Sequence, residues 1–141
     1  MSREGKAVKF AKDQLGVDEV YAEALDVHAK LEQSLTDIVR HSKEVRRLND
    51  DIEAREVDVI IELRAANPDA SGAAVERMAK EAYVSDQRLK ELRETLRAEQ
   101  HQHDLCQSAI TASKYRLRIL SARLNELGGL TAFYAATKGG A

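Results

Sequence analysis

The sequence has few aromatic residues, prolines and cysteines. Aromatic side chains make up 4% of the 141 residues, and the chain has one proline, one cysteine and no tryptophan. So few aromatics beside 33% charged residues disfavour a β-sandwich or barrel and fit the composition of long helices and coiled coils. A lone cysteine excludes an intramolecular disulfide framework and makes a reducing compartment the default.

Long hydrophobic runs are also missing. No uninterrupted apolar stretch approaches the roughly 20 residues that a helix needs to cross a bilayer, and no apolar signal core follows residues 1–6. We therefore expect a cytoplasmic protein without a membrane partner. The formal net charge of −2 excludes a general attraction to nucleic acid, although it leaves room for local basic patches.

Residues 18–66 contain neither proline nor glycine and carry an apolar residue at every seventh position. This spacing, with a second row three or four residues away, predicts a long helix with one apolar face. The first row is Ala24, Leu31, Ile38, Val45, Ile52, Val59 and Ala66, and the second includes Val20, Val27 and Leu48. We call the positions of these rows the seam. One helix cannot bury its own seam, so a partner helix is required.

A single strong break follows this helix. The residue before proline avoids helical backbone, so Asn67-Pro68 should end the helix near Ala66. Ser71 can cap a short helix over about 72–83. The segment 67–85 is therefore predicted as a turn with a short helix, and either Ser85 or Asp86 can cap the helix after it.

The second long helix is predicted over residues 86–127 and has its own heptad seam, with polar residues in the middle. One row is Leu89, Leu96, His103, Ile110, Leu117 and Leu124, and the other is Leu92, Glu99, Cys106, Ser113, Leu120 and Leu127. Two long helices joined at one break predict an all-α fold, a long antiparallel hairpin over 18–127 with coiled-coil-like seams. Because two helices offer little core, we also expect a homo-oligomer, either a bundle or a ring.

Glycines suggest where the two terminal segments join the long helices. Residues 1–17 predict a short amphipathic helix that stops at Gly16. Gly128-Gly129 is expected to stop the second long helix, because glycine favours the left-handed backbone of a helix end. Residues 128–141 then form a short C-terminal segment.

Polar residues within the seams suggest structural roles. If Ala66 lies near Ser85, Arg55 and Glu99 come within reach of each other and form an ion pair that sets the register. His101, His103 and Cys106 do not predict a metal site, because the two histidines point about 200° apart on a helix. Phosphate-binding loops and nucleophile elbows are missing as well. We expect no metal, no cofactor and no enzymatic activity.

Basic residues gather in two stretches, 40–47 and 111–124, and the second holds four bases and no acid. Cationic helix flanks with an occasional aromatic such as Tyr115 suit single-stranded nucleic acid, whose phosphates need charge and whose bases stack. The alternative is a solvated flank that pairs with acids of a neighbouring subunit. The residue pattern leaves both interpretations open.

Two resemblances bear on this choice. The ending Leu-Asn-Glu-Leu-Gly-Gly-Leu-Thr-Ala-Phe-Tyr-Ala-Ala over 124–136 resembles small helical proteins of actinobacterial phages. The whole layout, with a short first segment, two long helices joined at a polar turn and a basic distal helix, resembles phage recombination mediators of the UvsY kind. That resemblance implies a ring-forming protein that binds single-stranded DNA and helps a RecA-type recombinase to replace a single-strand-binding protein.

The mediators carry a DNA-contacting Lys-x-Arg pair near the end of their first long helix. The corresponding stretch here is Ile61-Glu62-Leu63-Arg64, so Arg64 matches the family's arginine while Glu62 replaces its lysine. We therefore expect a non-catalytic recombination or replication accessory protein that assembles as a helical oligomer. The alternative is a coiled-coil interaction or structural module without nucleic-acid binding. The expected DNA contacts are Lys43, Arg46, Arg47, Arg64, Lys114, Arg116, Arg118 and Arg123.

Overall fold

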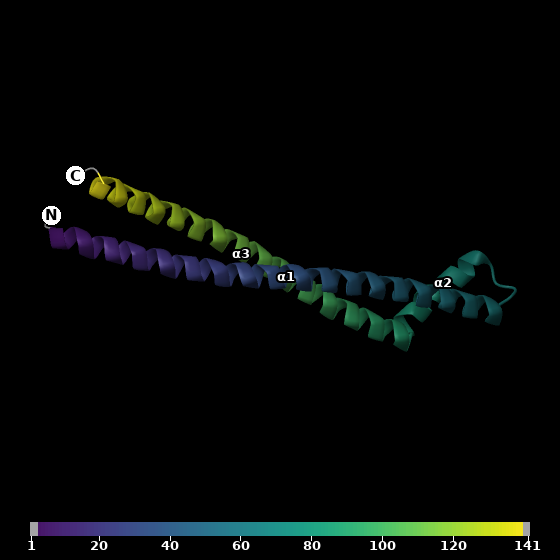
Figure 1. Ribbon diagram of the computed structural model, residues 1–141. Coiled ribbons are helices and arrows are strands. Elements are labelled where there is room, and N and C mark those ends of the chain that lie inside the picture. Colours follow the sequence, from purple (N-terminus) through teal and green to yellow (C-terminus); the bar gives the residue numbers. More distant parts are fainter. Residues whose placement is uncertain (1–2, 140–141) are drawn as a thin grey trace. The chain divides into compact units, whose positions relative to one another are not determined.

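A computed structural model describes the backbone of residues 3–139 and the side chains of residues 16–128. It contains three helices, α1 (Arg3–Ala66), α2 (Gly72–Ser85) and α3 (Gln87–Gly139) (Figure 1). The described residues form no strand, which confirms the predicted all-α class with two long helices. None of these helices, over its described part, has the length and apolar character of a membrane span.

Contacts divide the chain into two compact units. Unit 1 pairs the part of α1 up to residue 35 with the part of α3 from residue 107, and unit 2 comprises residues 36–106. The two long helices run antiparallel in each unit, as the predicted hairpin requires. Contacts far apart in sequence establish this pairing, such as Glu23 with Arg116 in unit 1 and His41 with Glu99 in unit 2.

Local side-chain chemistry fixes the helix ends in unit 2. The Asn67 side-chain amide donates to the Leu63 carbonyl at 3.0 Å, and α1 ends at Ala66 as predicted. Ser71 caps α2, because its hydroxyl accepts a hydrogen bond from the Ala74 amide at 3.2 Å. Asp86 caps α3 in the same way, with its Oδ2 accepting from the Leu89 amide at 3.0 Å.

Side-chain burial follows the predicted spacing. On α3, every seam position from Leu89 to Leu127 is buried or half-buried, and on α1 the same holds from Val20 to Val59. Beyond Val59 the seam positions are exposed, at Glu62 and at Ala66. The buried apolar side chains are Leu48, Val59, Val75, Ala79, Leu89, Leu92, Ile110, Leu120 and Leu127.

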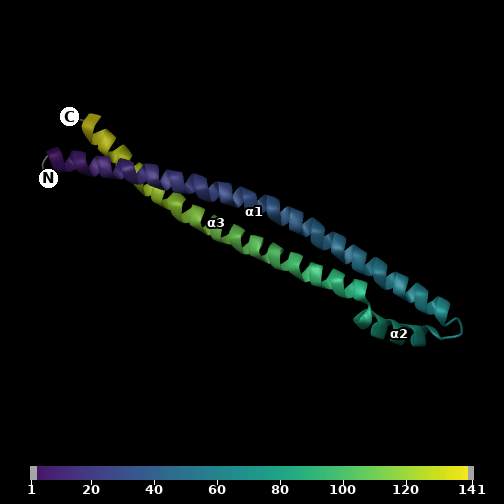
Figure 2. The same cartoon turned by 90° about the horizontal axis from the view of Figure 1, so that it is seen from below.

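The predicted register of the two long helices in unit 2 is wrong, and so is the Arg55–Glu99 ion pair. Arg55 instead binds Asp86, with Nη2 at 2.7 Å from Oδ1, and Glu99 contacts His41 at 2.7 Å. The cause is α2, which folds back along the end of α1 (Figure 2). The Tyr83 hydroxyl donates to the Glu56 carbonyl at 3.4 Å. Because α2 covers the last turns of α1, α3 begins level with Arg55 rather than Ala66.

The predicted helix ends at Gly16 and Gly128-Gly129 are also wrong. Helix α1 runs from Arg3 through Gly16, so residues 1–17 are not a separate helix, and α3 continues to Gly139 instead of ending before a segment 128–141. No glycine among the described residues has a positive φ. A glycine within a helix costs about 1 kcal/mol relative to alanine, which a long helix packed against a partner tolerates.

Gly16→Ala is expected to raise the free energy of unfolding by about 1 kcal/mol. The alanine removes the glycine penalty, and its Cβ would lie 3.8 Å from Leu127 Cδ1, an ordinary packing distance. Gly128→Ala is the matched control, because its Cβ would meet nothing within 4 Å and only helix propensity improves. Urea unfolding followed by circular dichroism measures both. A loss of stability in Gly16→Ala would contradict the packing described.

Candidate interaction surfaces

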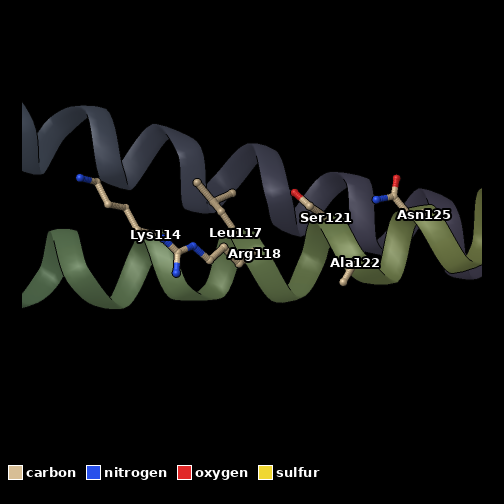
Figure 3. A pocket seen from close by; sticks show the side chains of 6 residues that line it. All are labelled: Lys114, Leu117, Arg118, Ser121, Ala122 and Asn125. Atoms are coloured by element: carbon tan, nitrogen blue, oxygen red, sulfur yellow. The ribbon is translucent and has the colours of Figure 1, made fainter.

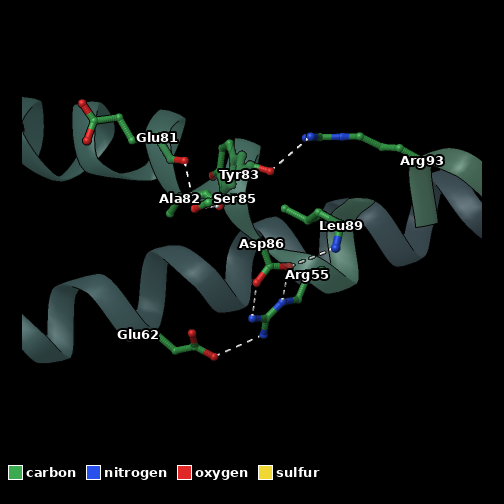
Figure 4. A network of polar contacts seen from close by, with 9 residues as sticks. All are labelled: Arg55, Glu62, Glu81, Ala82, Tyr83, Ser85, Asp86, Leu89 and Arg93. Carbon is green, nitrogen blue, oxygen red and sulfur yellow. Dashed lines mark hydrogen bonds and ion pairs between the residues drawn. The ribbon is translucent and has the colours of Figure 1, made fainter. Parts of the chain in front are cut away.

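A network of polar contacts holds the junction of α2 and α3 against α1 (Figure 4). Arg55 forms two hydrogen bonds with the Asp86 carboxylate, at 2.7 and 3.1 Å, and a third with Glu62 at 3.2 Å. The Arg55 guanidinium and the Leu89 amide lower the pKa of Asp86 to about 2, and Asp86 in turn raises the pKa of Arg55. Arg93 donates to the Tyr83 carbonyl at 3.2 Å from the other side. All these groups bind one another, so the network is structural.

Acid is expected to weaken the fold through Asp86. Its pKa lies near 2 in the folded chain, below its ordinary value of 3.8. The stabilisation by its ion pair is therefore complete above pH 4 and disappears as the pH falls through about 2. Thermal unfolding between pH 2 and 6 checks this expectation against Asp86→Asn, which keeps a capping oxygen but cannot ionise. The stability difference between the two proteins should shrink in acid, and a constant difference would refute the assignment.

The basic cluster at 43–47 lies in unit 2 on one helix. Arg47 binds two acids of its own helix, Glu44 and Asp51, and its hydrogen bond lowers the pKa of Glu44. Lys43 and Arg46 are exposed and form no hydrogen bond or ion pair with any residue in 16–128. Arg64 stands about 27 Å along α1 from Arg46 at 1.5 Å per residue, so it does not extend this cluster.

The basic cluster at 114–123 lies in unit 1, and two of its arginines are already paired. Arg116 Nε is 2.8 Å from Glu23 Oε1 on α1, and Arg123 is 3.5 Å from Glu126. Lys114 and Arg118 have no such partner in the described part of the chain. Both line a shallow surface hollow on α3, together with Leu117, Ser121, Ala122 and Asn125 (Figure 3).

Exposed apolar side chains on α1 are the feature that the sequence analysis missed. Tyr21 is 57% exposed, Leu25 56% and Leu35 43%. Each directly follows a seam residue, namely Val20, Ala24 and Ser34, so the three occupy one side of the helix next to the seam. The signal in the sequence is the large apolar residue at three of the positions that directly follow the seam between residues 20 and 35.

The Glu23–Arg116 pair shows which flanks of the two helices share a side of unit 1. Both residues directly precede a seam position, Ala24 and Leu117, and they touch. In an antiparallel pair, residues that directly follow the seam therefore meet on the opposite side. Lys114 and Arg118 follow Ser113 and Leu117 in this way. We call the side that carries Tyr21, Leu25, Leu35, Lys114 and Arg118 the flank face.

Each of the two seam histidines lies near one carboxylate. His41 Nδ1 lies 2.7 Å from Glu99 Oε2, and their side chains are 14% and 27% exposed. His103 is 3.7 Å from Asp104. No group of three or more histidine, cysteine or acidic side chains that could hold a metal ion occurs among the described residues.

Comparison with known proteins identified no relative of this chain. No protein-family model, curated protein or solved structure matches the chain.

Proposed function

We propose that this protein is a non-catalytic helical interaction module, which acts by binding other helices along its exposed apolar flank. The observation that carries the proposal is the row of Tyr21, Leu25 and Leu35, each 43–57% exposed on a face next to the seam. Large apolar side chains that recur along one face of a helix are typical anchors for a second helix. The charged residues support this interpretation, because three of the eight predicted DNA contacts bind acids of the chain itself.

Photo-crosslinking in cells that make the protein tests this function. A photoreactive phenylalanine replaces Leu25, and Ala29, which is exposed on the outer side of the same helix, provides the control position. We expect a discrete adduct from position 25 and none from position 29. Excess wild-type chain should compete the adduct away, whereas Tyr21→Ser/Leu25→Ser should not. Equal labelling from both positions would refute the proposal.

Single-stranded DNA binding is the second candidate function. A recombination mediator is the more specific function that would include it. Lys114 and Arg118 favour it, since they lie one turn apart on α3 without a partner in the described chain. Tyr115 between them is 67% exposed and can stack on a base. A helical homo-oligomer would multiply such weak contacts, and a recombinase or single-strand-binding protein would be the protein partner.

Replacing Lys114 and Arg118 by serine is expected to weaken binding to oligo-dT if this second function holds. Two lost phosphate contacts should flatten the slope of log affinity against log salt by about 1.4, as measured by fluorescence anisotropy. The matched control is Arg77→Ser/Lys90→Ser, which removes two exposed bases from unit 2 and should leave the slope unchanged. No binding of the wild-type chain at low salt would exclude the second function.

A further inference from the structure

We infer that the flank face of unit 1 binds a second copy of this chain, with α1 of one copy against α3 of the other. The inference rests on the proposed function and names its partner. Three properties of the face support it: its exposed apolar row, the opposite charges of its two helices, and a hollow at the level of that row. Together they specify both the partner and the orientation.

The charges select α3 as the surface that α1 meets. On the flank face, where residues directly follow the seam, α1 carries the carboxylates of Asp18 and Glu32 and no base, whereas α3 carries Lys114 and Arg118 and no acid over residues 107–128. Two copies of α1 face to face would bring carboxylates together. With α1 of one copy on α3 of the other, the acidic flank of α1 instead faces the flank of α3 that carries Lys114 and Arg118, which have no partner in the described chain.

The hollow gives the apolar row a place to dock. On the flank face the hollow is lined by Lys114 and Arg118 at one end and by Asn125 at the other. The small side chains of Ser121 and Ala122 lie between them. Because Glu23 lies level with Arg116, the hollow spans the level of Tyr21 and Leu25 on α1. Tyr21 of the second copy therefore lies over the hollow, whose lining includes the short side chains of Ser121 and Ala122 (Figure 3).

Symmetry then fixes the register. The arrangement has a two-fold axis parallel to the helices, so both copies use the same face. A two-fold rotation includes no translation, and each residue of α1 therefore meets the α3 residue of its own level. His28 of one copy lies opposite Thr111 of the other, five residues to either side of the Glu23–Arg116 level.

The size of the face sets the expected affinity. Residues 18–35 of a helix span about 27 Å, which gives an interface at or below the lower limit for specific complexes. We therefore expect a weak dimer whose dissociation constant lies in the micromolar range. Sedimentation velocity of the full chain between 5 and 500 µM measures this equilibrium. A single species of monomer mass across that range would overturn the inference.

Two double variants of the flank face test the surface, and both share one control. Tyr21→Ser/Leu25→Ser and Lys114→Glu/Arg118→Glu should each raise the dissociation constant at least tenfold while circular dichroism shows unchanged helix content. Val57→Ser/Ile61→Ser removes two equally exposed apolar residues of unit 2 and should leave the constant unchanged. If the control variant dissociates the dimer and the flank variants do not, the surface is wrongly assigned.

Disulfide trapping tests the orientation. The chain's single cysteine, Cys106, is replaced by serine in both partners, one of which carries His28→Cys and the other Thr111→Cys. Mixing the two should give a mixed disulfide dimer, whereas each alone should give little. A disulfide between two His28→Cys chains would instead show α1 against α1 and refute the orientation.

Failure of this inference is distinguishable from failure of the proposed function. A chain that stays monomeric when purified, yet forms a competed adduct from position 25 with a different protein in cells, would overturn the second copy as partner. It would leave the interaction module intact. Absence of both results would refute the two proposals together.

Discussion

Leu89→Ala is expected to lower the free energy of unfolding by about 3 kcal/mol, the typical loss for a leucine removed from a packed interior. Leu89 is 0% exposed, the lowest value in the described chain, and lies in the first turn of α3. The register given by Arg55–Asp86 and His41–Glu99 places it level with Ile52 on α1. The alanine therefore leaves a cavity where α3 first meets α1.

Leu105→Ala is the matched control for this prediction. It makes the same chemical change on the same helix within unit 2, but Leu105 is 50% exposed, and surface substitutions usually change stability by less than about 0.5 kcal/mol. Urea unfolding at constant protein concentration compares the two variants. If Leu89→Ala unfolds the chain outright, the smaller cavity of Leu89→Val keeps the effect measurable. Equal losses at positions 89 and 105 would contradict the interior position of Leu89.

The secondary structure could be predicted from the sequence because local rules determine it. Seven-residue apolar spacing marks the buried side of α1 and α3, Asn67-Pro68 ends α1, and Ser71 begins α2. Each of these depends on residues within one or two turns. The helix ends predicted at the two glycine positions were wrong. A glycine lowers helix stability by only a small amount, and packing along a partner helix outweighs that loss.

The register could not be predicted, because it depends on where α2 goes. A turn that simply reverses the chain would bring Ser85 beside Ala66. The helix α2 instead folds back, with Val75 and Ala79 buried and Tyr83 bound to Glu56, so α3 is displaced along α1. The pairing of the basic residues could not be predicted for a related reason. Which basic residues remain unpaired depends on cross-helix contacts such as Glu23–Arg116, and those follow only once the register is known.

Replacing both His41 and Glu99 by leucine is expected to stabilise the chain by about 1–3 kcal/mol, as when well-packed apolar residues replace a hydrogen-bonded polar pair in an interior. Each single replacement should destabilise it, because the remaining partner stays half-buried without its hydrogen bond. The two side chains lie 2.7 Å apart at seam positions of α1 and α3, where leucine fits the spacing. A double-mutant cycle from urea unfolding measures the coupling.

The sign of that cycle decides why the chain keeps a polar pair within an apolar seam. If the double variant is more stable, the pair does not serve stability, and its role is to fix the register that α2 imposes on α3. A seam of leucines alone packs nearly as well after a shift of one heptad, whereas His41 and Glu99 meet in one alignment only. If the double variant loses as much as the two single variants together, the pair contributes independently at each position. The register would then rest on the other polar contacts with α1, Arg55–Asp86 and Arg93–Glu56 among them.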